Sequence, residues 1–374
     1  MKPPPDVAGA DRVVDEALAH DTFFTAGQRR NIRLKARDLA EERTVWESVP
    51  FRLQFEPNRR CNVKCLHCDI ERGGSGEFDL ALIERALDQI GWGCTELLPY
   101  VGGDPTLAEL DRIAPLARKH GAWLTLTTNG HLFTRRMHES VADVTARLCF
   151  SFHTHDADVF RRVMPSLDYD TVVRNIADAT ALARVHDTDV VTALVVLDSN
   201  LETLDEYVRF VHRLGVRRIV FQRLFPESKV FPSEGVDGDG ARLPPETVRA
   251  HLRRALDAAI ELGVFVETNV AAIHGDPRNV QRRRTRFDVL NETSALVDLY
   301  CPRFCRQTAT TLLVEWDGTV LPCCRDHIVL GNLHDRSLPE IWNGAAMQEL
   351  RESFYVPRWR SHCARCFEFC NGKP

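Results

Sequence analysis

Two hydrophobic periods alternate along the first half of the chain. In FRLQFEP, residues 51–57, apolar side chains take every second position and leave Arg52, Gln54 and Glu56 on the opposite face, which predicts a strand. In residues 79–91 the apolar side chains instead recur every three or four positions, between an aspartate that can cap a helix and a glycine that can end it. The pattern therefore opens with a strand followed by a helix.

The same order repeats further along the chain. The later strands that alternation predicts are TELLPYVGG, WLTLTTNG, RLCFSFHT, VVTALVVL and RRIVFQRLF. The helices predicted between them lie at about 107–120, 135–144, 169–185 and 200–215, the last capped by Asn200. Six strand–helix units in a row favour an α/β fold with a parallel sheet wrapped by helices. Since a closed barrel of this kind has about eight units, we expect an open, partial (β/α)6 TIM-like barrel, with its ligands at the carboxyl ends of the strands.

The pattern divides the chain into three regions. Residues 1–50 have helix-like spacing after an early PPP breaker and predict an N-terminal helical extension. Residues 51–300 contain the partial barrel and a bridging segment with one more helix and the strand VFVETNV. Residues 301–374 predict a small α+β domain, because the hairpin TTLLVEWDGTVLPCC turns at Asp317 and Gly318 and is followed by a helix and a cysteine-rich tail.

Composition and charge narrow the class of protein. The 374 residues, 44% of them hydrophobic, can form a sizeable core. Because the sequence contains no apolar run of about 18 residues and no secretion signal at its start, we expect a cytoplasmic protein without a membrane partner. A net charge of −5 argues against a nucleic-acid partner, and we interpret the basic run RNVQRRRTR at 278–286 as a solvated surface.

Cysteine placement points to the chemistry. Twelve cysteines in a reducing compartment do not predict a disulfide framework. Cys61, Cys65 and Cys68 stand together in CNVKCLHC, directly after the first predicted strand, and seven more lie in the C-terminal quarter. Cys94 and Cys149 are isolated in apolar surroundings, and we interpret both as small core residues.

Three thiolates in one loop suit an iron–sulfur cubane better than zinc. Structural zinc sites favour two close pairs of ligands, whereas C-x-x-x-C-x-x-C is one compact loop whose nearest further ligand is His67. Three thiolates can hold three corners of a cubane and leave the fourth iron open. We therefore expect a reactive [4Fe–4S] cluster at the carboxyl ends of the strands, with zinc as the alternative.

At these residues the chain resembles the radical S-adenosylmethionine (radical SAM) enzymes, and the resemblance covers most of the sequence. The signature C-x-x-x-C-x-aromatic-C follows the first strand with His67 in the aromatic position, VGGDP follows the second, and TTNG closes the third. The resemblance implies that the three cysteines hold the cluster and that His67 contacts S-adenosyl-L-methionine (SAM). It further implies that the methionine amino group is held by the backbone of Gly102, Gly103, Asp104 and Pro105.

A later segment, FSFHTHDADVFRR, resembles the part of these enzymes that contacts the rest of SAM. The resemblance assigns Ser151 to the ribose and Arg162 to the cofactor carboxylate. His153 stands where many relatives have an aspartate, which indicates a different contact at that position.

The C-terminal cysteines resemble the SPASM and twitch extensions of the same enzymes, which carry auxiliary [4Fe–4S] clusters. The resemblance implies one auxiliary cluster held by Cys305, Cys323, Cys363 and Cys366. A complete SPASM domain holds two clusters and needs more cysteines after the closing pair, where only Cys370 remains, so the one-cluster twitch arrangement is favoured. Cys301, Cys324 and Cys370 are interpreted as bystanders, although each could replace a ligand or donate hydrogen to a radical.

The inner face of the predicted barrel offers candidate catalytic residues. Gln54 and Glu56 share one face of the first strand, and either Gln222 or Arg223 of the sixth must point inward because neighbours alternate. With His153, the residues Glu56 and Arg223 are the candidates. Such polar side chains suit a hydroxylated substrate.

The resemblance implies that SAM is cleaved to a 5′-deoxyadenosyl radical, with electrons from a flavodoxin- or ferredoxin-type donor. We expect a small-molecule substrate, a sugar, aminocyclitol or sugar nucleoside in antibiotic biosynthesis, that undergoes oxidation, dehydration, decarboxylation or epimerisation. The reason is that the N-terminal extension of about 50 residues is shorter than the leader-binding domain of many peptide-modifying relatives. Peptide modification is the alternative; a non-catalytic electron carrier would leave the open cluster corner unexplained.

Overall fold

The computed structural model describes Val14 and residues 23–68, 78–225, 228–236, 243–281, 283–325, 328–356, 358–361 and 363–366. The strands are β1 (Arg52–Phe55), β2 (Glu96–Leu98), β3 (Trp123–Thr128), β4 (Thr145–Ser151), β5 (Asp189–Val196), β6 (Arg218–Arg223), β7 (Phe265–Thr268), β8 (Thr311–Val314), β9 (Thr319–Leu321) and β10 (Gly331–Asn332).

Helices connect most of these strands. The helices are α2 (Ala26–Ala40), α3 (Leu80–Ile90), α4 (Leu110–His120), α5 (Arg135–Val141), α6 (Ala157–Val163), α7 (Tyr169–His186), α8 (Leu204–Arg213), α9 (Phe231–Glu234), α10 (Pro245–Leu262), α11 (Arg286–Tyr300), α12 (Arg306–Thr310), α13 (Leu338–Trp342) and α14 (Ala345–Tyr355). Short 3-10 turns are η1 (Pro105–Leu107), η2 (Ala142–Val144) and η3 (Leu201–Thr203).

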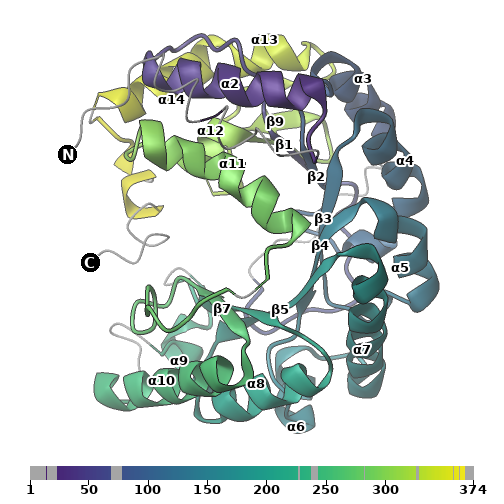
Figure 1. Cartoon of the computed structure of the whole chain (residues 1–374), viewed down its shortest axis with the longest axis vertical. Helices are drawn as coiled ribbons and strands as arrows, with labels where there is room; N and C mark the ends of the chain where they lie inside the picture. The colour runs from purple at the N-terminus through teal and green to yellow at the C-terminus, as the bar shows by residue number, and fades with distance from the viewer. Residues whose placement is uncertain are drawn as a thin grey trace.

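All ten strands form one sheet, in the order β10-β9-β8-β1-β2-β3-β4-β5-β6-β7. Strands β1 to β7 run parallel, which confirms the predicted parallel α/β architecture, and helices surround the sheet in Figure 1. The hairpin of the C-terminal region joins the same sheet, because β8 pairs in parallel with β1 from Arg52 opposite Thr311 to Phe55 opposite Val314. The sheet therefore continues past the predicted domain boundary near residue 300, and β8 covers the edge that β1 would otherwise leave open.

The two faces of the sheet carry different cores. Leu148 and Phe150 of β4 belong to the main hydrophobic core, together with apolar residues of the surrounding helices. Cys149 points the other way and forms a separate small cluster with Val191 and Ala193. We call this second surface the inner face. Cys149 is buried as predicted, but it lines the inner face rather than the main core, and burial raises the pKa of its thiol to about 12.

One predicted helix cap is wrong. Asn200 does not cap α8, which begins at Leu204 without a side-chain cap. The Asn200 amide instead donates to the carbonyl oxygens of His153 and Val195, both at 2.9 Å, and its Oδ1 accepts from the Leu197 N–H at 2.9 Å. These hydrogen bonds to the segment after β4 and to the end of β5 occupy the side chain that the sequence pattern assigned to the start of α8.

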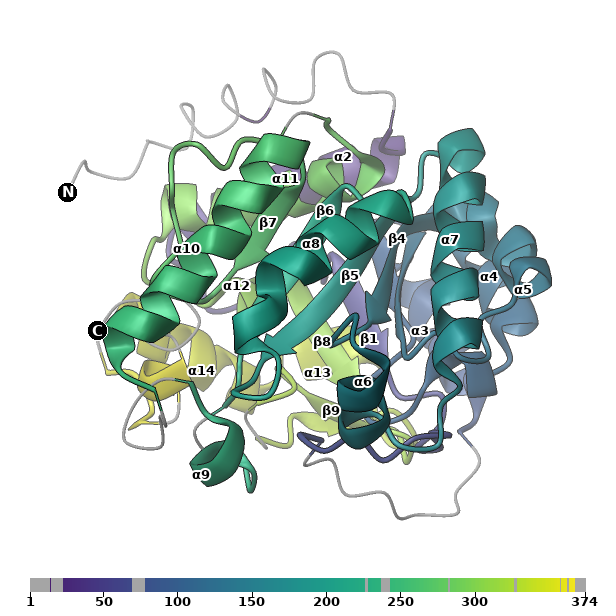
Figure 2. The same ribbon diagram turned by 90° about the horizontal axis from the view of Figure 1, so that it is seen from below.

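An ion-pair network closes the amino ends of the strands. Arg218 of β6 donates to both carboxylate oxygens of Asp288 in α11 at 2.8 Å and to Glu267 of β7 at 2.9 Å. Arg147 of β4 binds Glu267 at 2.6 Å and Asp189 of β5 at 2.8 Å. These contacts fasten α11 to this end, and Figure 2 shows α11 opposite the end where α6 and α9 lie. The carboxyl ends, where a ligand site was predicted, are therefore on the side away from α11.

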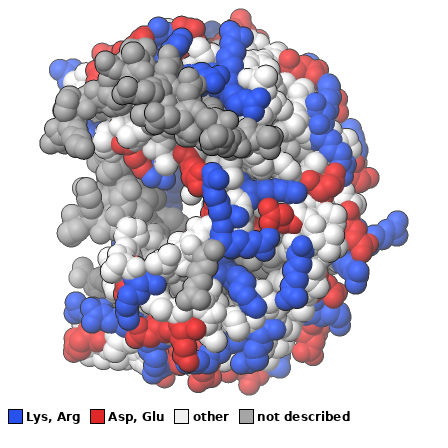
Figure 3. Space-filling view, viewed as in Figure 1, with Lys and Arg blue, Asp and Glu red and all other residues white. Residues whose placement is uncertain are grey.

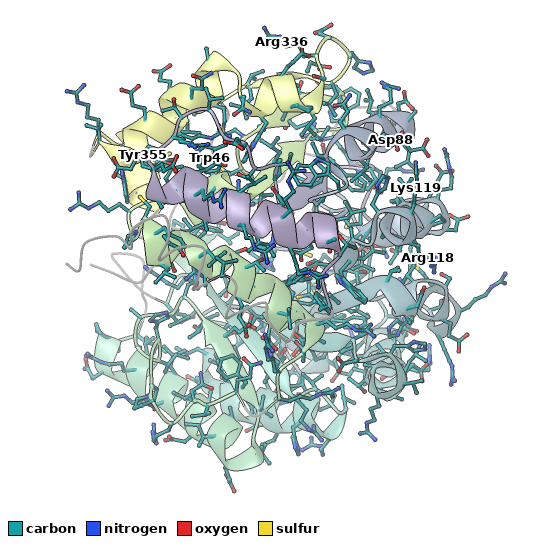
Figure 4. All side chains as sticks on the ribbon, turned by 45° about the horizontal axis from the view of Figure 1, so that its top comes forward. Trp46, Asp88, Arg118, Lys119, Arg336 and Tyr355 are labelled. Carbon is teal, nitrogen blue, oxygen red and sulfur yellow. The ribbon has the colours of Figure 1, made fainter. Side chains whose placement is uncertain are left out.

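A buried junction joins the N-terminal and C-terminal regions. Lys35 of α2 places its Nζ 4.0 Å from the ring centroid of Trp46 and 4.7 Å from that of Trp342. Arg351 of α14 donates to the carbonyl of Trp342 at 2.8 Å, and Trp46 lies beside Tyr355 of the same helix in Figure 4. Burial lowers the pKa of Lys35, and the aromatic faces compensate in part for the loss of water around its charge.

Charges of both signs are interspersed over the face shown in Figure 3. Three arginines of the predicted basic run are exposed, and each pairs with a carboxylate: Arg278 with Asp257 and Asp276, Arg283 with Asp187, and Arg284 with Glu292. Among the described helices, none is both long and apolar enough to cross a membrane.

The ion-pair network generates a stability prediction. Although burial opposes its ionisation, hydrogen bonds from Arg218 and Thr285 lower the pKa of Asp288 to about 2. Asp288→Ala leaves the buried Arg218 with fewer carboxylate partners, so we expect the free energy of unfolding to fall by about 3 kcal/mol in denaturant titrations. The control is Asp88→Ala, which removes the exposed pair with Lys119 seen in Figure 4 (2.7 Å) and should change stability little. Equal losses in the two variants would contradict the prediction.

Candidate active site

The three clustered cysteines lie where the sequence predicted, in the irregular segment after β1. Cys61, Cys65 and Cys68 are each half-buried. The backbone N–H of Leu66 donates to the carbonyl of Val163 at the end of α6 (2.8 Å), which ties the segment to the carboxyl ends of the strands. Figure 2 shows α6 and this segment at the end opposite α11.

The loop after β2 packs directly against the cysteine segment. The Asp104 N–H donates to the carbonyl of Arg60 at 2.9 Å. A Cβ on Gly103 would lie 2.4 Å from the backbone oxygen of Asn58 and 2.8 Å from that of Arg60, closer than real Cβ atoms come. Glycine is therefore required at this position for the two loops to meet.

The Asp104 carboxylate binds the chain itself. It is 4% exposed and accepts hydrogen bonds from the Thr106 N–H (2.9 Å), the Thr128 hydroxyl (3.0 Å) and the Asn129 N–H (2.8 Å). Asp104 also caps η1, so that α4 begins at Leu110 rather than near 107 as predicted. Its side chain thus holds the second loop against the end of β3.

Asn129 contacts the cysteine segment from the end of β3, a role the sequence analysis did not assign. Its side-chain amide donates to Cys61 Sγ at 3.8 Å and to Asn62 Oδ1 at 2.7 Å. Asn129 belongs to the TTNG motif that the sequence analysis noted. Its contact with Cys61 could not be predicted from the motif, because the two residues are 68 positions apart in the sequence.

His67 and His153, predicted from different motifs, meet in the structure. Their rings pack edge to face with centroids 4.3 Å apart. His153 is 5% exposed, and its Nδ1 accepts from the Val195 N–H at 3.1 Å. Burial, with the nearby His67, lowers the pKa of His153 well below its usual value. The ring is therefore neutral, with its proton on Nε2, and serves as a hydrogen-bond donor.

Ser151 and Arg162, predicted to contact SAM, stand near the same end. Ser151 is the last residue of β4, half-buried and opposite Ala193 on the inner face. Arg162 is exposed on α6, next to the Val163 carbonyl that holds the cysteine segment.

Glu56 is buried at the junction of β1 and the C-terminal hairpin. Its N–H donates to the Val314 carbonyl at 2.9 Å, and its Oε1 accepts from Arg59 Nε at 3.3 Å. The side chain is 1% exposed, and its Oε2 has no hydrogen-bond partner in the part of the chain that is described. Burial raises the pKa of Glu56, although the charge of Arg59 and a hydrogen bond from the Trp316 backbone act to lower it.

The register of β6 corrects one candidate. Gln222 pairs with Val195, two residues along from the inner-face Ala193, whereas Arg223 pairs with Val196 on the opposite face. Paired residues of parallel strands share a face, so Gln222 and not Arg223 continues the inner face. The alternation predicted that one of the two points inward, and the pairing identifies which.

The C-terminal cysteines gather around the hairpin. Cys305 precedes α12, Cys323 follows β9, and Cys363 and Cys366 lie in the last described helical turn; all four are half-buried. Gly318 has φ +83°, as the predicted turn requires. Cys370 falls outside the described residues.

Cys324, which the sequence analysis interpreted as a bystander, follows Cys323 directly in the chain and is exposed. Crowding by the surrounding chain, rather than full burial, raises the pKa of its thiol, and the nearby thiols of Cys366 and Cys305 raise it further. Cys324 therefore lies near two of the predicted ligands. Cys301, at the end of α11, is half-buried. Among the described residues, no three His, Cys, Asp or Glu side chains are arranged to hold a single metal ion.

The donor sets fit iron–sulfur clusters chemically. In the cysteine segment three thiols stand in one loop, with a hydrogen-bond donor on one sulfur and a glycine-lined loop alongside. Thiolates with hydrogen bonds to sulfur are the usual environment of such clusters. Cys305 and Cys323, two of the four cysteines predicted for the auxiliary cluster, flank the hairpin strands β8 and β9.

Comparison with known proteins agrees with both sites. The family model of the radical SAM superfamily matches residues 55–211, and that of SPASM, an iron–sulfur cluster-binding domain, matches residues 305–367. The chain is 35% identical over 348 residues to the Fe-coproporphyrin III synthase of Methanosarcina barkeri, a match that covers 84% of this chain and 80% of that protein.

Two further relatives are more distant. The mycofactocin maturase MftC of Mycobacterium tuberculosis is 23% identical over 335 residues, which cover 87% of this chain and 78% of MftC. The crystal structure of Streptococcus suis SuiB bound to precursor peptide SuiA has a TM-score of 0.59 at 16% identity, over 94% of this chain and 76% of SuiB, and so shares the fold. From these matches and the two cysteine sites, the chain belongs to the radical SAM superfamily and carries a SPASM iron–sulfur cluster-binding domain.

Proposed function

We propose that this protein is a radical SAM enzyme that removes a hydrogen atom from a peptide substrate. The observation that carries the radical chemistry is the three-cysteine segment at the carboxyl end of β1, held against the loop of Gly103 and Asp104. The relatives favour a peptide over the small molecule expected from the sequence, because SuiB was solved with its precursor peptide and MftC is named a maturase.

A second candidate substrate is an iron tetrapyrrole that the enzyme would convert to an iron porphyrin. The relative with 35% identity is named Fe-coproporphyrin III synthase, and that identity exceeds the 23% shared with MftC. The two candidates differ in size, charge and colour, so one experiment can separate them.

In the proposed site, Cys61, Cys65 and Cys68 hold the [4Fe–4S] cluster, and the backbone of residues 102–105 holds the methionine amino group of SAM. When bound, the cluster supplies one electron to SAM, and the 5′-deoxyadenosyl radical that results takes a hydrogen atom from the substrate. Ser151 and the neutral His153 offer hydrogen bonds near the end of β4. Both residues orient the bound molecule, in a region that the protein encloses.

Glu56 and Gln222 are the proposed substrate contacts. Glu56 has a raised pKa and is buried, with the Trp316 backbone N–H close to its carboxylate, so it can hold a proton or accept a hydrogen bond from substrate. Gln222 replaces the predicted Arg223, because it continues the inner face of β6. Both side chains offer hydrogen bonds of the kind that a peptide backbone requires.

The C-terminal site is proposed to hold an auxiliary cluster on Cys305, Cys363, Cys366 and one of the pair Cys323 and Cys324. With four protein thiolates no iron is free for substrate, so the proposed role of this cluster is electron transfer. A flavodoxin- or ferredoxin-type protein is the proposed external donor.

The first prediction concerns cluster content. We expect anaerobically reconstituted protein to bind about eight irons per chain, as two cubanes require. Changing Cys61, Cys65 and Cys68 together to Ala should reduce this to about four and abolish the conversion of SAM to 5′-deoxyadenosine, measured by chromatography. Persistent 5′-deoxyadenosine in the triple variant would refute the assignment, and about twelve irons in the parent protein would indicate two auxiliary clusters.

The second prediction tests the contact between the two loops. Gly103→Ala forces the loop after β2 away from the cysteine segment, since its Cβ would meet backbone oxygens at 2.4 and 2.8 Å. Overpacking of this kind costs about 1–3 kcal/mol, so we expect SAM to bind about tenfold more weakly in equilibrium titrations. Gly344→Ala is the control: its nearest contact would be 3.2 Å, at the start of α14, and SAM affinity should be unchanged.

The third prediction separates the substrate classes. Reduced protein with SAM is incubated with peptides encoded beside the gene, with an iron tetrapyrrole precursor of Fe-coproporphyrin III, or with hydroxylated small molecules. We expect 5′-deoxyadenosine formation to rise only with a peptide, whose mass changes in the same reaction by mass spectrometry. A response to the tetrapyrrole precursor alone, with Fe-coproporphyrin III as the product, would select the second candidate, and a response to a sugar or aminocyclitol would restore the expectation from sequence. The triple cysteine variant gives the background.

A further inference from the structure

Asn129 is held rigidly at the end of β3. It is 6% exposed. Its backbone N–H donates to Asp104 Oδ2 at 2.8 Å, and its side-chain Oδ1 accepts from the His131 N–H at 3.0 Å. Because Oδ1 has this donor as its partner, the orientation of the amide is determined, and the two N–H groups of Nδ2 must point to acceptors.

The two acceptors are the Cys61 sulfur, at 3.8 Å, and Asn62 Oδ1, at 2.7 Å. Asn62 is itself hydrogen-bonded to His131 through its amide, with Asn62 Nδ2 3.2 Å from His131 Nδ1. The amide of Asn129 therefore lies between the cysteine segment and the turn that follows β3, with both of its donors used.

We propose that Asn129 is a positioning residue that raises the reduction potential of the cluster on Cys61, Cys65 and Cys68. This inference rests on the proposed function, since it requires a cluster at these cysteines. A hydrogen bond to a ligating sulfur stabilises the added negative charge of the reduced cluster, so its presence makes reduction easier. The effect is largest away from water, and Asn129 is buried.

The same residue connects the cluster to the loop proposed to hold SAM. Asp104 fixes the backbone of Asn129 and belongs to that loop, while the Asn129 side chain reaches the Cys61 sulfur. A displacement of the loop after β2 would therefore move the donor on the sulfur, which links occupancy of the SAM site to the ease of cluster reduction.

The test compares Asn129→Asp, Asn129→Ala and the control Asn175→Ala in reconstituted protein. Asn129→Asp keeps the oxygen that accepts from the His131 N–H but removes both donors. Asn175 of α7 supports the same turn from the other side: its amide donates to the carbonyls of Gly130 (2.8 Å) and His131 (3.2 Å) rather than to a cysteine. Its loss should lower stability and leave the potential unchanged.

The measurement is the midpoint potential of the SAM-binding cluster, from a redox titration followed by electron paramagnetic resonance. We expect a shift to more negative potential in Asn129→Ala and a larger one in Asn129→Asp, which adds a charge. An unchanged potential in both, or an equal shift in Asn175→Ala, would overturn the inference. If the parent protein bound no cluster at the three cysteines, the proposed function itself would fail, which iron analysis reveals separately.

A second measurement covers the case in which the Asn129 variants assemble no cluster. Parent protein labelled with ¹⁵N in asparagine side chains should show a nitrogen coupling to the reduced cluster in pulsed resonance spectra. The coupling should persist in Asn62→Ala, because Asn129 retains its contact with Cys61. Absence of any such coupling in the parent protein would contradict the proposal.

Discussion

The parallel pairing of β1 with β8 is the constraint on which the rest of the molecule depends. β1 is bordered by β2 on one side and β8 on the other, so the cysteine segment after β1 and the hairpin turn after β8 leave the sheet at the same end. Cys305, before β8, and Cys323, after the antiparallel β9, lie toward the opposite end of these strands. Glu56 lies where β1 meets the hairpin, donating to the Val314 carbonyl at 2.9 Å. Backbone groups make this pairing, so it does not depend on particular side chains. It holds the strands next to the two cysteine sets in one sheet.

Buried charges reinforce this arrangement away from the site. Lys35 between the rings of Trp46 and Trp342 joins the N-terminal helix to the C-terminal region, and Arg218 holds α11 over the amino ends of the strands. Such charges are costly to bury without partners, so the elements that supply the partners are fixed in position. The carboxyl ends remain as the side on which loops can differ and a ligand can bind.

At that end the chain forms irregular loops, and a few polar side chains hold these loops in place. The Asp104 carboxylate joins the loop after β2 to the end of β3, and the Asn129 amide joins β3 to the cysteine segment. Each makes more than one hydrogen bond within the protein, which holds short irregular loops in a single geometry. The loops can therefore present cysteine sulfurs and backbone groups to a ligand without help from a helix or strand at those positions.

The sequence by itself determined the parallel α/β order, the position of the cysteine segment after the first strand and the hairpin turn at Gly318, because each depends on local spacing or on the conformation of one residue. The tertiary structure alone decided that β8 extends the barrel sheet, that Gln222 rather than Arg223 continues the inner face, that Cys324 lies near Cys305 and Cys366, and that Asn129 reaches Cys61. These features join residues that are far apart in the chain. Hydrophobic periodicity predicts single helices and strands, but it does not indicate which distant strand or loop will lie beside each of them.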